Sequence, residues 1–259
     1  MATKKVEENH DVILVEQGRL TVNIVGTSPL IIHRLSDKAR QELLLPAGRK
    51  STAEKSVSLK HDPVAEFQAS PYMLNEGPSL LALTSTTFKA AMGTAALDLP
   101  GPTKAKIGRL VYVENDYVPI FGLPKLFMSI VRSADMNRTP DVRTRTIVPE
   151  WACELSIAYV EPVIKPVSIY RLLVAAGITA GVGDWRPQKG KGAYGRFTIT
   201  QEGDENWERF QRIIADGGRI PQQVAMANPE AYDSETEELL SWYMDTAKDR
   251  GFKPTEATV

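Results

Sequence analysis

The sequence from residue 172 to residue 199, LLVAAGITAGVGDWRPQKGKGAYGRFTI, passes from an apolar segment into a loop that is rich in glycine and in cations. Six glycines fall within nineteen residues, and they are accompanied by four cations and three aromatic residues: Gly177, Gly181, Gly183, Gly190, Gly192, Gly195, Arg186, Lys189, Lys191, Arg196, Trp185, Tyr194 and Phe197. Glycine permits close approach of the backbone, cations neutralise phosphate, and aromatic faces stack on bases. The composition of this Gly-rich loop therefore predicts a binding site for a polyanion.

The order of structure around the loop narrows the kind of polyanion. The segment Val167–Ala176 has apolar residues at helical spacing, with Gly177 expected as its C-terminal stop, and GRFTIT after the loop has the composition of a strand. A dinucleotide-binding GxGxxG loop lies instead between a strand and a following helix, and the GxxxxGK[ST] phosphate loop is absent because Lys191 is followed by Gly192. We expect no nucleotide cofactor and no other cofactor.

Charge is unevenly distributed along the 259 residues. Basic and acidic residues number 11 and 11 in residues 1–100, 14 and 8 in residues 101–199, and 6 and 13 in residues 200–259, so the three parts carry net charges of 0, +6 and −7. The total is only −1, and the excess of cations is concentrated around the Gly-rich loop.

Cysteine and histidine content bounds the class of protein. The single cysteine, Cys153, excludes an intramolecular disulfide, and three histidines leave little material for a zinc site, so no metal is expected. The N-terminal residues have no apolar core of a signal peptide, and no apolar run reaches the ~18 residues of a membrane span. We expect a cytoplasmic protein without membrane contact.

The first half of the chain predicts strands, one clear helix and a long insertion. Val12–Val15 and Arg19–Val25 have the pattern of a hairpin, a short helix is expected over residues 36–46, and residues 47–76 have no sustained period and are expected to form an irregular insertion. A short strand over residues 79–83 precedes a helix over residues 84–97, which opens with hydroxyl residues and places Phe88 and Met92 on one face. The segment LPGPTKAKIGR is expected to be a turn.

Residues 135–145 hold three arginines, Arg138, Arg143 and Arg145, among turn-forming residues. Two interpretations are open: these arginines contact phosphates, or they lie in an exposed turn with local salt bridges to Asp135 and Asp141.

After Gln201 the sequence becomes acidic and helical. NWERFQRIIAD is amphipathic, and a second helix is expected to begin at Ser234 as cap, with Glu237 three residues later. We interpret residues 201–259 as an acidic helical appendage to a core over residues 12–200.

The order of strands and helices in the core predicts an α+β fold with a four-stranded sheet, as in ferredoxin-like and RNA-recognition folds. A helix that ends at a glycine, then GxG, a cationic segment, GxGxxG and an aromatic strand, resembles the C-terminal Gly-rich loop of the RAMP superfamily, the subunits of CRISPR effector complexes. The matching residues are Gly177, Gly181, Gly183, Gly190, Gly192, Gly195 and Phe197. The segment LTSTTFKAAMGTAAL, with Lys89, and the opening RLTVNIVGTSPLII are similar to other parts of that superfamily.

This resemblance implies a protein that binds single-stranded RNA or DNA and repeats as a backbone subunit along the strand, with the insertion of one copy reaching over its neighbour. The residues expected to bind nucleic acid are Lys89, Arg138, Arg143, Arg145, Gly181, Gly183, Trp185, Arg186, Lys189, Gly190, Lys191, Gly192, Tyr194 and Arg196. The mechanism expected is that the cations neutralise phosphates and the glycines allow main-chain N–H groups to reach them.

Three alternatives stay open. The glycines can simply build a tight crossing from helix to strand, and Trp185 is then expected to pack on the core. An RNA-processing endoribonuclease of the same superfamily would use His33 or Asp37, although no catalytic residue is nominated here because no second histidine or paired carboxylate accompanies them. A subunit that binds only protein, or that acts as a decoy in an RNA-guided complex, would explain the acidic C-terminal part.

Overall fold

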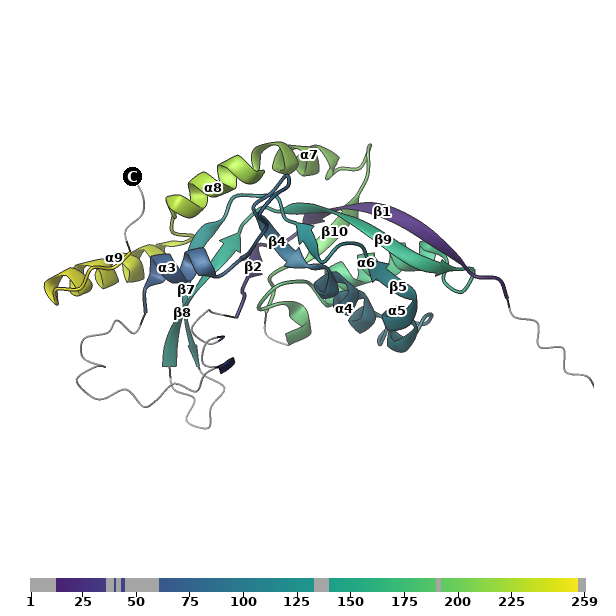
Figure 1. Ribbon diagram of the computed structural model, residues 1–259, viewed down its shortest axis with the longest axis horizontal. Helices are drawn as coiled ribbons and strands as arrows, with labels where there is room; N and C mark the ends of the chain where they lie inside the picture. Colours follow the sequence, from purple (N-terminus) through teal and green to yellow (C-terminus); the bar gives the residue numbers. More distant parts are fainter. Residues whose placement is uncertain are drawn as a thin grey trace, which may run out of the picture.

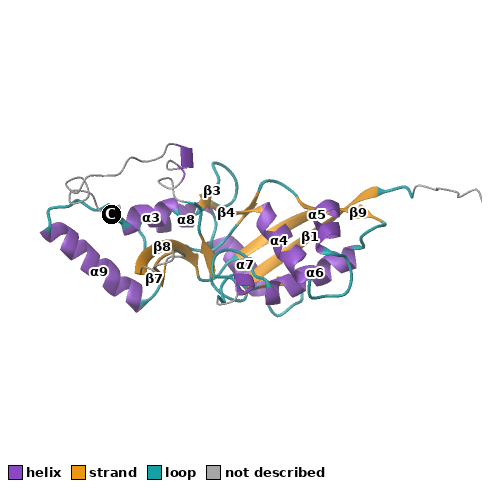
Figure 2. Ribbon diagram, turned by 90° about the horizontal axis from the view of Figure 1, so that it is seen from below, coloured by secondary structure: helices purple, strands orange, loops and turns teal. Residues whose placement is uncertain are grey.

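The computed structural model describes residues 13–35, 40, 43–44, 61–132, 140–189 and 192–255. The chain forms an elongated α+β body, with helix α9 (Ser234–Asp249) at one end and the long ribbon of strands β1 (Glu16–Gly26) and β9 (Ala152–Glu161) at the other (Figures 1 and 2). Among the described residues, no helix is both long enough and apolar enough to cross a membrane.

The core is an antiparallel four-stranded sheet in the order β10-β1-β9-β5, completed by β5 (Val111–Val113) and β10 (Phe197–Thr200). Helix α4 (Ser85–Ala95) lies in sequence between β1 and β5, and helix α6 (Pro166–Thr179) lies between β9 and β10. Strand, helix, two strands, helix and strand in this spatial order give the connectivity of a ferredoxin-like fold. The predicted α+β class with a four-stranded sheet is therefore confirmed.

Alternation along β1 divides its side chains between two packing layers. Ile24 lies in the main core with Phe88 of α4 and Leu173 of α6, whereas the next residue, Val25, belongs to a smaller cluster with Phe210. Successive strand residues point to opposite faces, so helices cover both faces of the sheet at this end. Phe88, Met92, Ile169, Leu172, Leu173 and Ala176 are all buried, as the helical spacing of the sequence predicts.

Two smaller sheets extend the core, and both come from segments inserted into the ferredoxin-like order. One has the order β2-β8-β7 and the other β3-β4-β6. Their strands are β2 (Leu30–Ile32), β3 (Tyr72–Met73), β4 (Leu81–Thr84), β6 (Tyr117–Pro119), β7 (Lys125–Arg132) and β8 (Pro140–Val148). Helix α3 (Pro63–Ala69) packs against β8 and buries Phe67.

Helices α7 (Trp207–Asp216), α8 (Arg219–Ala227) and α9 follow the last strand and close over the sheets. Gln222 of α8 is fully buried, and its side chain accepts hydrogen bonds from the N–H groups of Leu80 and Leu81 while donating to three carbonyls. Arg219 donates to three more carbonyls, those of Leu74, Gly77 and Ser79. Six loop carbonyls and two N–H groups of the core are thus satisfied by α8.

The N-terminal half confirms one predicted strand and corrects other elements. The strand expected over Arg19–Val25 lies within β1, but the described residues before it, 13–15, form no strand, so the predicted hairpin is wrong; β1 pairs instead with β9 from Glu16 to Val25. Residues 63–69 form helix α3 and not irregular chain. Asp62 caps the helix by accepting a hydrogen bond from Ala65 N–H. The helix buries only three residues, too few to show a helical period in the sequence. Of the helix expected over residues 36–46, only residues 40, 43 and 44 are described, and they are helical; residues 47–60 of the insertion lie outside the described residues.

Two further segments expected to be turns are regular. Residues 104–110 of LPGPTKAKIGR form helix α5 (Lys104–Leu110), capped by the Thr103 hydroxyl. Arg143 and Arg145 lie within strand β8, because residues 140–147 pair one by one with residues 125–132 of β7. Long-range pairing outweighs local turn composition here.

Two helix ends also differ from expectation. Gly177 does not end α6 but lies inside it, where an added Cβ would come within 2.0 Å of the Phe197 carbonyl oxygen, so this glycine permits α6 to touch β10. Helix α9 is capped by Asp233, whose carboxylate accepts from Thr236 N–H at 2.8 Å, and not by Ser234.

Candidate nucleic-acid interface

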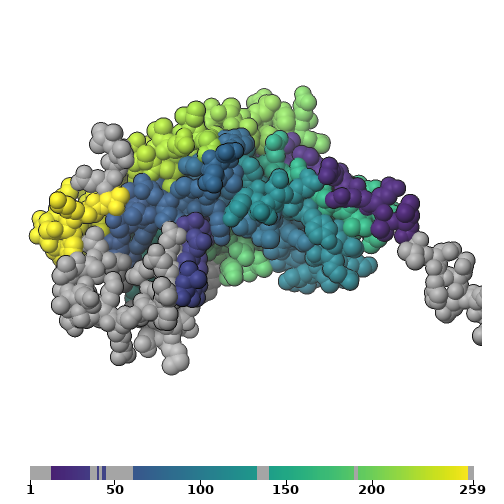
Figure 3. All heavy atoms as spheres, in the orientation of Figure 1, coloured from purple at the N-terminus to yellow at the C-terminus, as the bar shows by residue number. Residues whose placement is uncertain are grey.

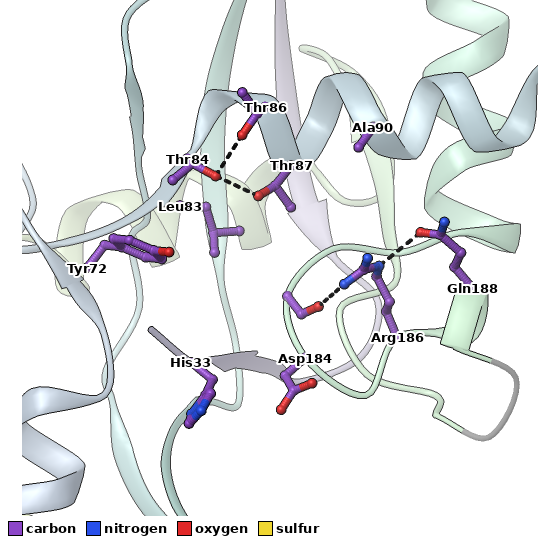
Figure 4. A pocket seen from close by; sticks show the side chains of 11 residues that line it. His33, Tyr72, Leu83, Thr84, Thr86, Thr87, Ala90, Asp184, Arg186 and Gln188 are labelled. Carbon is purple, nitrogen blue, oxygen red and sulfur yellow. Dashed lines mark hydrogen bonds between the residues drawn. The ribbon is translucent and has the colours of Figure 1, made fainter. Parts of the chain in front are cut away.

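A pocket of about 400 Å³ opens between the N-terminus of α4 and the Gly-rich loop (Figure 4). One wall comes from the end of β4 and the first turns of α4, the other from the loop after α6, and the floor from the segment after β2. The lining residues are His33, Tyr72, Leu83, Thr84, Thr86, Thr87, Ala90, Gly183, Asp184, Arg186 and Gln188.

Three threonine hydroxyls gather at the α4 wall. Thr84 Oγ1 lies 2.9 Å from Thr87 Oγ1 and accepts a hydrogen bond of 3.0 Å from Thr86 (Figure 4). Although Thr84 occupies the N-cap position, its side chain makes no capping hydrogen bond, and Ser85 N–H donates to the Asp116 carbonyl. Within the described chain, no side chain caps this turn, and its residues Thr84, Thr86 and Thr87 line the pocket, so the positive end of the helix dipole lies at this wall together with hydroxyls. These are the donors that an anion needs.

Arg186 brings a cation to the opposite wall. One terminal nitrogen donates to the Gly183 carbonyl at 2.7 Å, and Nε donates to Gln188 Oε1 at 3.1 Å. Both bonds hold the guanidinium over the pocket, and a guanidinium has five N–H groups, so donors remain for a ligand (Figure 4).

Arg145, in contrast, is held inside the protein. Its side chain is buried, donates to Ser129 Oγ at 3.0 Å, forms an ion pair with Asp184 at 3.1 Å and lies 4.9 Å from the centroid of the Trp185 ring. Burial lowers the pKa of this guanidinium, and the charge of Asp184 opposes that shift. Arg145 therefore neutralises Asp184 beside the pocket. The sequence predicted that Arg145 contacts a phosphate, but its side chain is buried and does not reach one at the surface.

His33 stands at the pocket beside these groups. Partial burial of the ring is the main reason that its pKa is lowered; the charge of Arg145 lowers it further and that of Asp184 opposes the shift. The imidazole is accordingly neutral at pH 7, which leaves one ring nitrogen able to accept a proton.

The glycines of the loop serve close packing. Gly181, Gly183 and Gly195 have positive φ angles of 65°, 78° and 67°, and an added Cβ at Gly195 would come within 1.8 Å of the Val182 carbonyl oxygen. The surrounding main-chain N–H groups donate within the protein: Gly181 to Ala176, Val182 to Gly195, Asp184 to Ile31 and Gly195 to Pro29. These four donors are not available to phosphates, contrary to the expected mechanism, and the tight crossing from helix to strand is the observed role of these glycines.

The aromatic residues of the loop pack on the three-stranded sheet β2-β8-β7. Trp185 and Tyr194 lie 6.1 and 6.3 Å, centroid to centroid, from Phe127 of β7, and 6.1 Å from each other. They are only partly buried around a core of Ile31, Phe127 and Ile147. Both rings anchor the loop to this sheet while retaining exposed edges.

The other residues predicted to bind nucleic acid are dispersed. Arg143 is half-exposed and pairs with Asp141 at 3.4 Å, and Lys89 Nζ lies 4.5 Å from the centroid of the Tyr112 ring. Lys189 and Arg196 are exposed, and Gly192 lies against the Trp185 backbone. Arg138, Gly190, Lys191 and Asp37 lie outside the described residues.

Several polar residues of the pocket are not among those that the sequence predicted to bind nucleic acid. They are Tyr72, Thr84, Thr86, Thr87 and Gln188. The hydroxyl-rich opening of the helix was visible in the sequence as TSTT, yet nothing local indicated that it would face Arg186 about a hundred residues later.

Comparisons with known proteins give little further direction. No protein-family model and no curated protein matches the sequence. Among solved structures, the chain is similar to Cmr6 from Pyrococcus furiosus, with 11% sequence identity, coverage of 71% of this chain and 98% of that chain, and a TM-score of 0.36. A likeness this loose does not support an inference about function, and the resemblance of the Gly-rich loop to the RAMP superfamily stays a prediction.

Proposed function

We propose that this protein binds single-stranded nucleic acid, RNA or DNA, and that the pocket beside α4 takes a phosphate of the strand. The observation that carries the proposal is the meeting of an uncapped helix N-terminus, three threonine hydroxyls and Arg186 around one pocket of about 400 Å³. Backbone and hydroxyl donors with one arginine suit a phosphate oxygen, because each supplies a hydrogen bond and the arginine supplies charge.

The surroundings of the pocket fit an extended strand. Lys189 and Arg196 are exposed on the same Gly-rich loop, and Tyr72 contributes an aromatic ring at the other side of the pocket. A strand that crosses from Tyr72 to the loop would meet a ring, then the threonines, then cations, which is the combination of stacking and charge used for single strands. The volume of the pocket is that of a site for one small ligand, so one copy of the protein covers only a short piece of the strand. Repeated copies are needed to cover a long strand.

The test is a salt titration of binding. Fluorescence anisotropy with labelled oligo(U) and oligo(dT) is expected to show affinity that falls steeply with salt, with a slope of ~0.7 per phosphate contacted. Arg186→Gln is expected to weaken binding about tenfold, the effect of losing one charge-assisted hydrogen bond. Lys248→Gln, which removes an exposed cation from α9 away from the pocket, is the matched control and should leave binding unchanged. Absent binding, or binding that does not depend on salt, would refute the proposal.

A second candidate is cleavage of RNA at the same pocket. The observation that favours it is the position of His33, with its pKa lowered, on the same pocket as the threonines and Arg186, because a neutral imidazole next to a bound phosphate can act as a general base on a 2′-hydroxyl. A single-turnover assay on labelled RNA decides it: cleavage that is lost in His33→Ala while binding is kept supports the enzyme, and intact RNA with the wild-type protein excludes it.

A further inference from the structure

The two ends of the elongated molecule carry surfaces of complementary character. Figures 1 and 2 place α9 at one end and α5, with the connection from α4, toward the other, and Figure 3 shows α9 as the exposed tip of its end. The α9 end combines an apolar groove with acidic residues, and the α5 end combines exposed leucines with cations.

The α9 surface has an apolar groove beside an exposed aromatic residue. A groove of about 250 Å³ lies between α9, β7, β8 and α3, and its apolar walls include Met128, Val142, Leu239 and Phe252. Trp242, which also lines the groove, remains 66% exposed despite its size. Large exposed aromatic residues beside apolar grooves are typical of interfaces between proteins.

Acidic side chains border that groove along the helix. Glu235, Glu238, Trp242, Asp245 and Asp249 are exposed at spacings of three, four, three and four residues, so they form one stripe of α9 with the tryptophan at its centre. The cations close to the stripe are Lys248 and, at the end of the helix, Arg250, which lines the groove with His61. The stripe itself carries four negative charges and no positive one.

The α5 surface has the opposite charge and its own exposed apolar residues. Lys104, Lys106 and Arg109 are exposed on α5, which has no acidic residue. Leu97 and Leu99, in the connection from α4, are 65% and 42% exposed, and Asp98 between them is the one acidic residue of this knob, residues 97–109. The knob therefore presents two leucines beside three cations.

We infer that the knob of one copy docks in the α9 groove of the next, with its leucines beside Trp242 and its cations on the acidic stripe. Both the apolar and the charged parts of each surface then find a counterpart, and exposed pairs of this kind contribute mainly to orientation and partner choice. Because the two surfaces differ and lie at opposite ends, the contact is head-to-tail and adds copies in a row. This inference specifies the contact for the repeated copies of the proposed function, and it is tested without nucleic acid, so the two can fail separately.

Two charge-reversed variants give the sharpest test. Glu238→Lys with Asp245→Lys makes the groove end as basic as the knob, and Lys106→Glu with Arg109→Glu makes the knob as acidic as the groove. Each variant is expected to sediment as the 28.6 kDa protomer where the wild-type chain forms larger species at low salt. An equimolar mixture of the two is expected to assemble again, because each groove then meets an oppositely charged knob.

Controls separate docking from general charge effects. Glu202→Lys with Glu205→Lys reverses the same amount of charge on the exposed turn before α7 and should leave assembly intact. Trp242→Ala should abolish assembly without reversing any charge, and circular dichroism checks that every variant is folded. A wild-type chain that stays a monomer at low salt, or variants that assemble as the wild type does, would overturn the inference, as would a mixture that stays monomeric.

Discussion

The two walls of the pocket are built in different ways. On the loop wall, glycines at positive φ bring backbone against backbone, main-chain N–H groups donate to carbonyls of the same protein, and Arg145 is buried against Asp184. On the helix wall, Thr84 leaves the first turn of α4 uncapped, and its hydroxyl bonds only to neighbouring threonines. The main chain of the loop is thus satisfied internally, whereas the helix end and Arg186 have donors to offer. Substitutions of the loop glycines and of Arg145 are expected to affect stability, and those of Arg186 and of the threonines at the helix end are expected to affect binding.

The largest expected effect is that of Gly195→Ala. The residue has φ of 67°, and a Cβ would meet the Val182 carbonyl oxygen at 1.8 Å, so backbone strain and overlap together should lower the free energy of unfolding by about 3 kcal/mol. Urea denaturation measures the loss. Gly203→Ala is the control, since φ is 91° but nothing lies within 4 Å of its Cβ, and it should cost only about 1 kcal/mol. Equal losses would mean that close packing at Gly195 contributes nothing.

Arg145→Gln is expected to cost about 2 kcal/mol of folding free energy, because it leaves Asp184 without its buried partner and removes the cation from the Trp185 ring. The neighbouring Arg143→Gln breaks a half-exposed pair with Asp141 and should change stability by less than about 0.5 kcal/mol. Thermal or urea unfolding of the two variants compares a cation held inside with one at the surface. A larger loss for Arg143→Gln would reverse the assignment.

These two arginines show how far sequence reasoning reaches. Helical spacing correctly predicted α4, α6 and α7, because each helix shows its pattern within a short segment. The order of elements along the chain then correctly predicted the four-stranded sheet. Both arginines appeared equally able to meet a phosphate, and because they are two residues apart in β8 they lie on the same face of the sheet. What separates them is the Gly-rich loop, whose Asp184 and Trp185 pack on Arg145, whereas Arg143 pairs with Asp141 of its own strand. Local composition does not show where a loop about forty residues later will pack.

The pocket illustrates the same limit from the other side. The Gly-rich loop and the hydroxyl-rich start of α4 were both identified as features, but in the sequence they are separate by about a hundred residues. Thr84 and Arg186 reach one pocket only because α4 packs beside α6 against the folded sheet. Asp233 was passed over as the cap of α9 because Ser234 and Glu237 fit the capping-box pattern one position later.

Thr86→Val examines the helix wall with a nearly isosteric change. It removes a hydroxyl whose single hydrogen is donated to Thr84, an exposed bond, so stability should change by less than about 0.5 kcal/mol. Affinity for single-stranded RNA should fall about fivefold, because a bound phosphate would accept that hydrogen in place of Thr84. Fluorescence anisotropy and urea denaturation on the same preparation provide both readouts. Thr94→Val, in the last turn of the same helix, is the control that should leave binding unchanged. A variant that loses stability but not affinity would assign the threonines to folding.

The smallest expected effect is a pH dependence from His33, which lies where the two walls meet. Because its pKa is lowered in the folded protein, the unfolded chain binds the proton more readily, so the contribution of His33 to stability is complete above the ordinary value of about 6.5 and is lost as pH falls from there toward the lowered value. Solvent contact limits the change to less than about 0.5 kcal/mol.

The stability difference between wild type and His33→Gln should therefore shrink as pH is lowered from 7.5 to 5, two values on either side of the ordinary histidine pKa of about 6.5. Both proteins retain His61, whose pKa is raised by its hydrogen bond to Glu66, so its opposite pH dependence cancels in the difference. A difference that grows as pH falls would mean that His33 gains a proton on folding and that an acidic neighbour, Asp184, outweighs the burial and the arginines beside it.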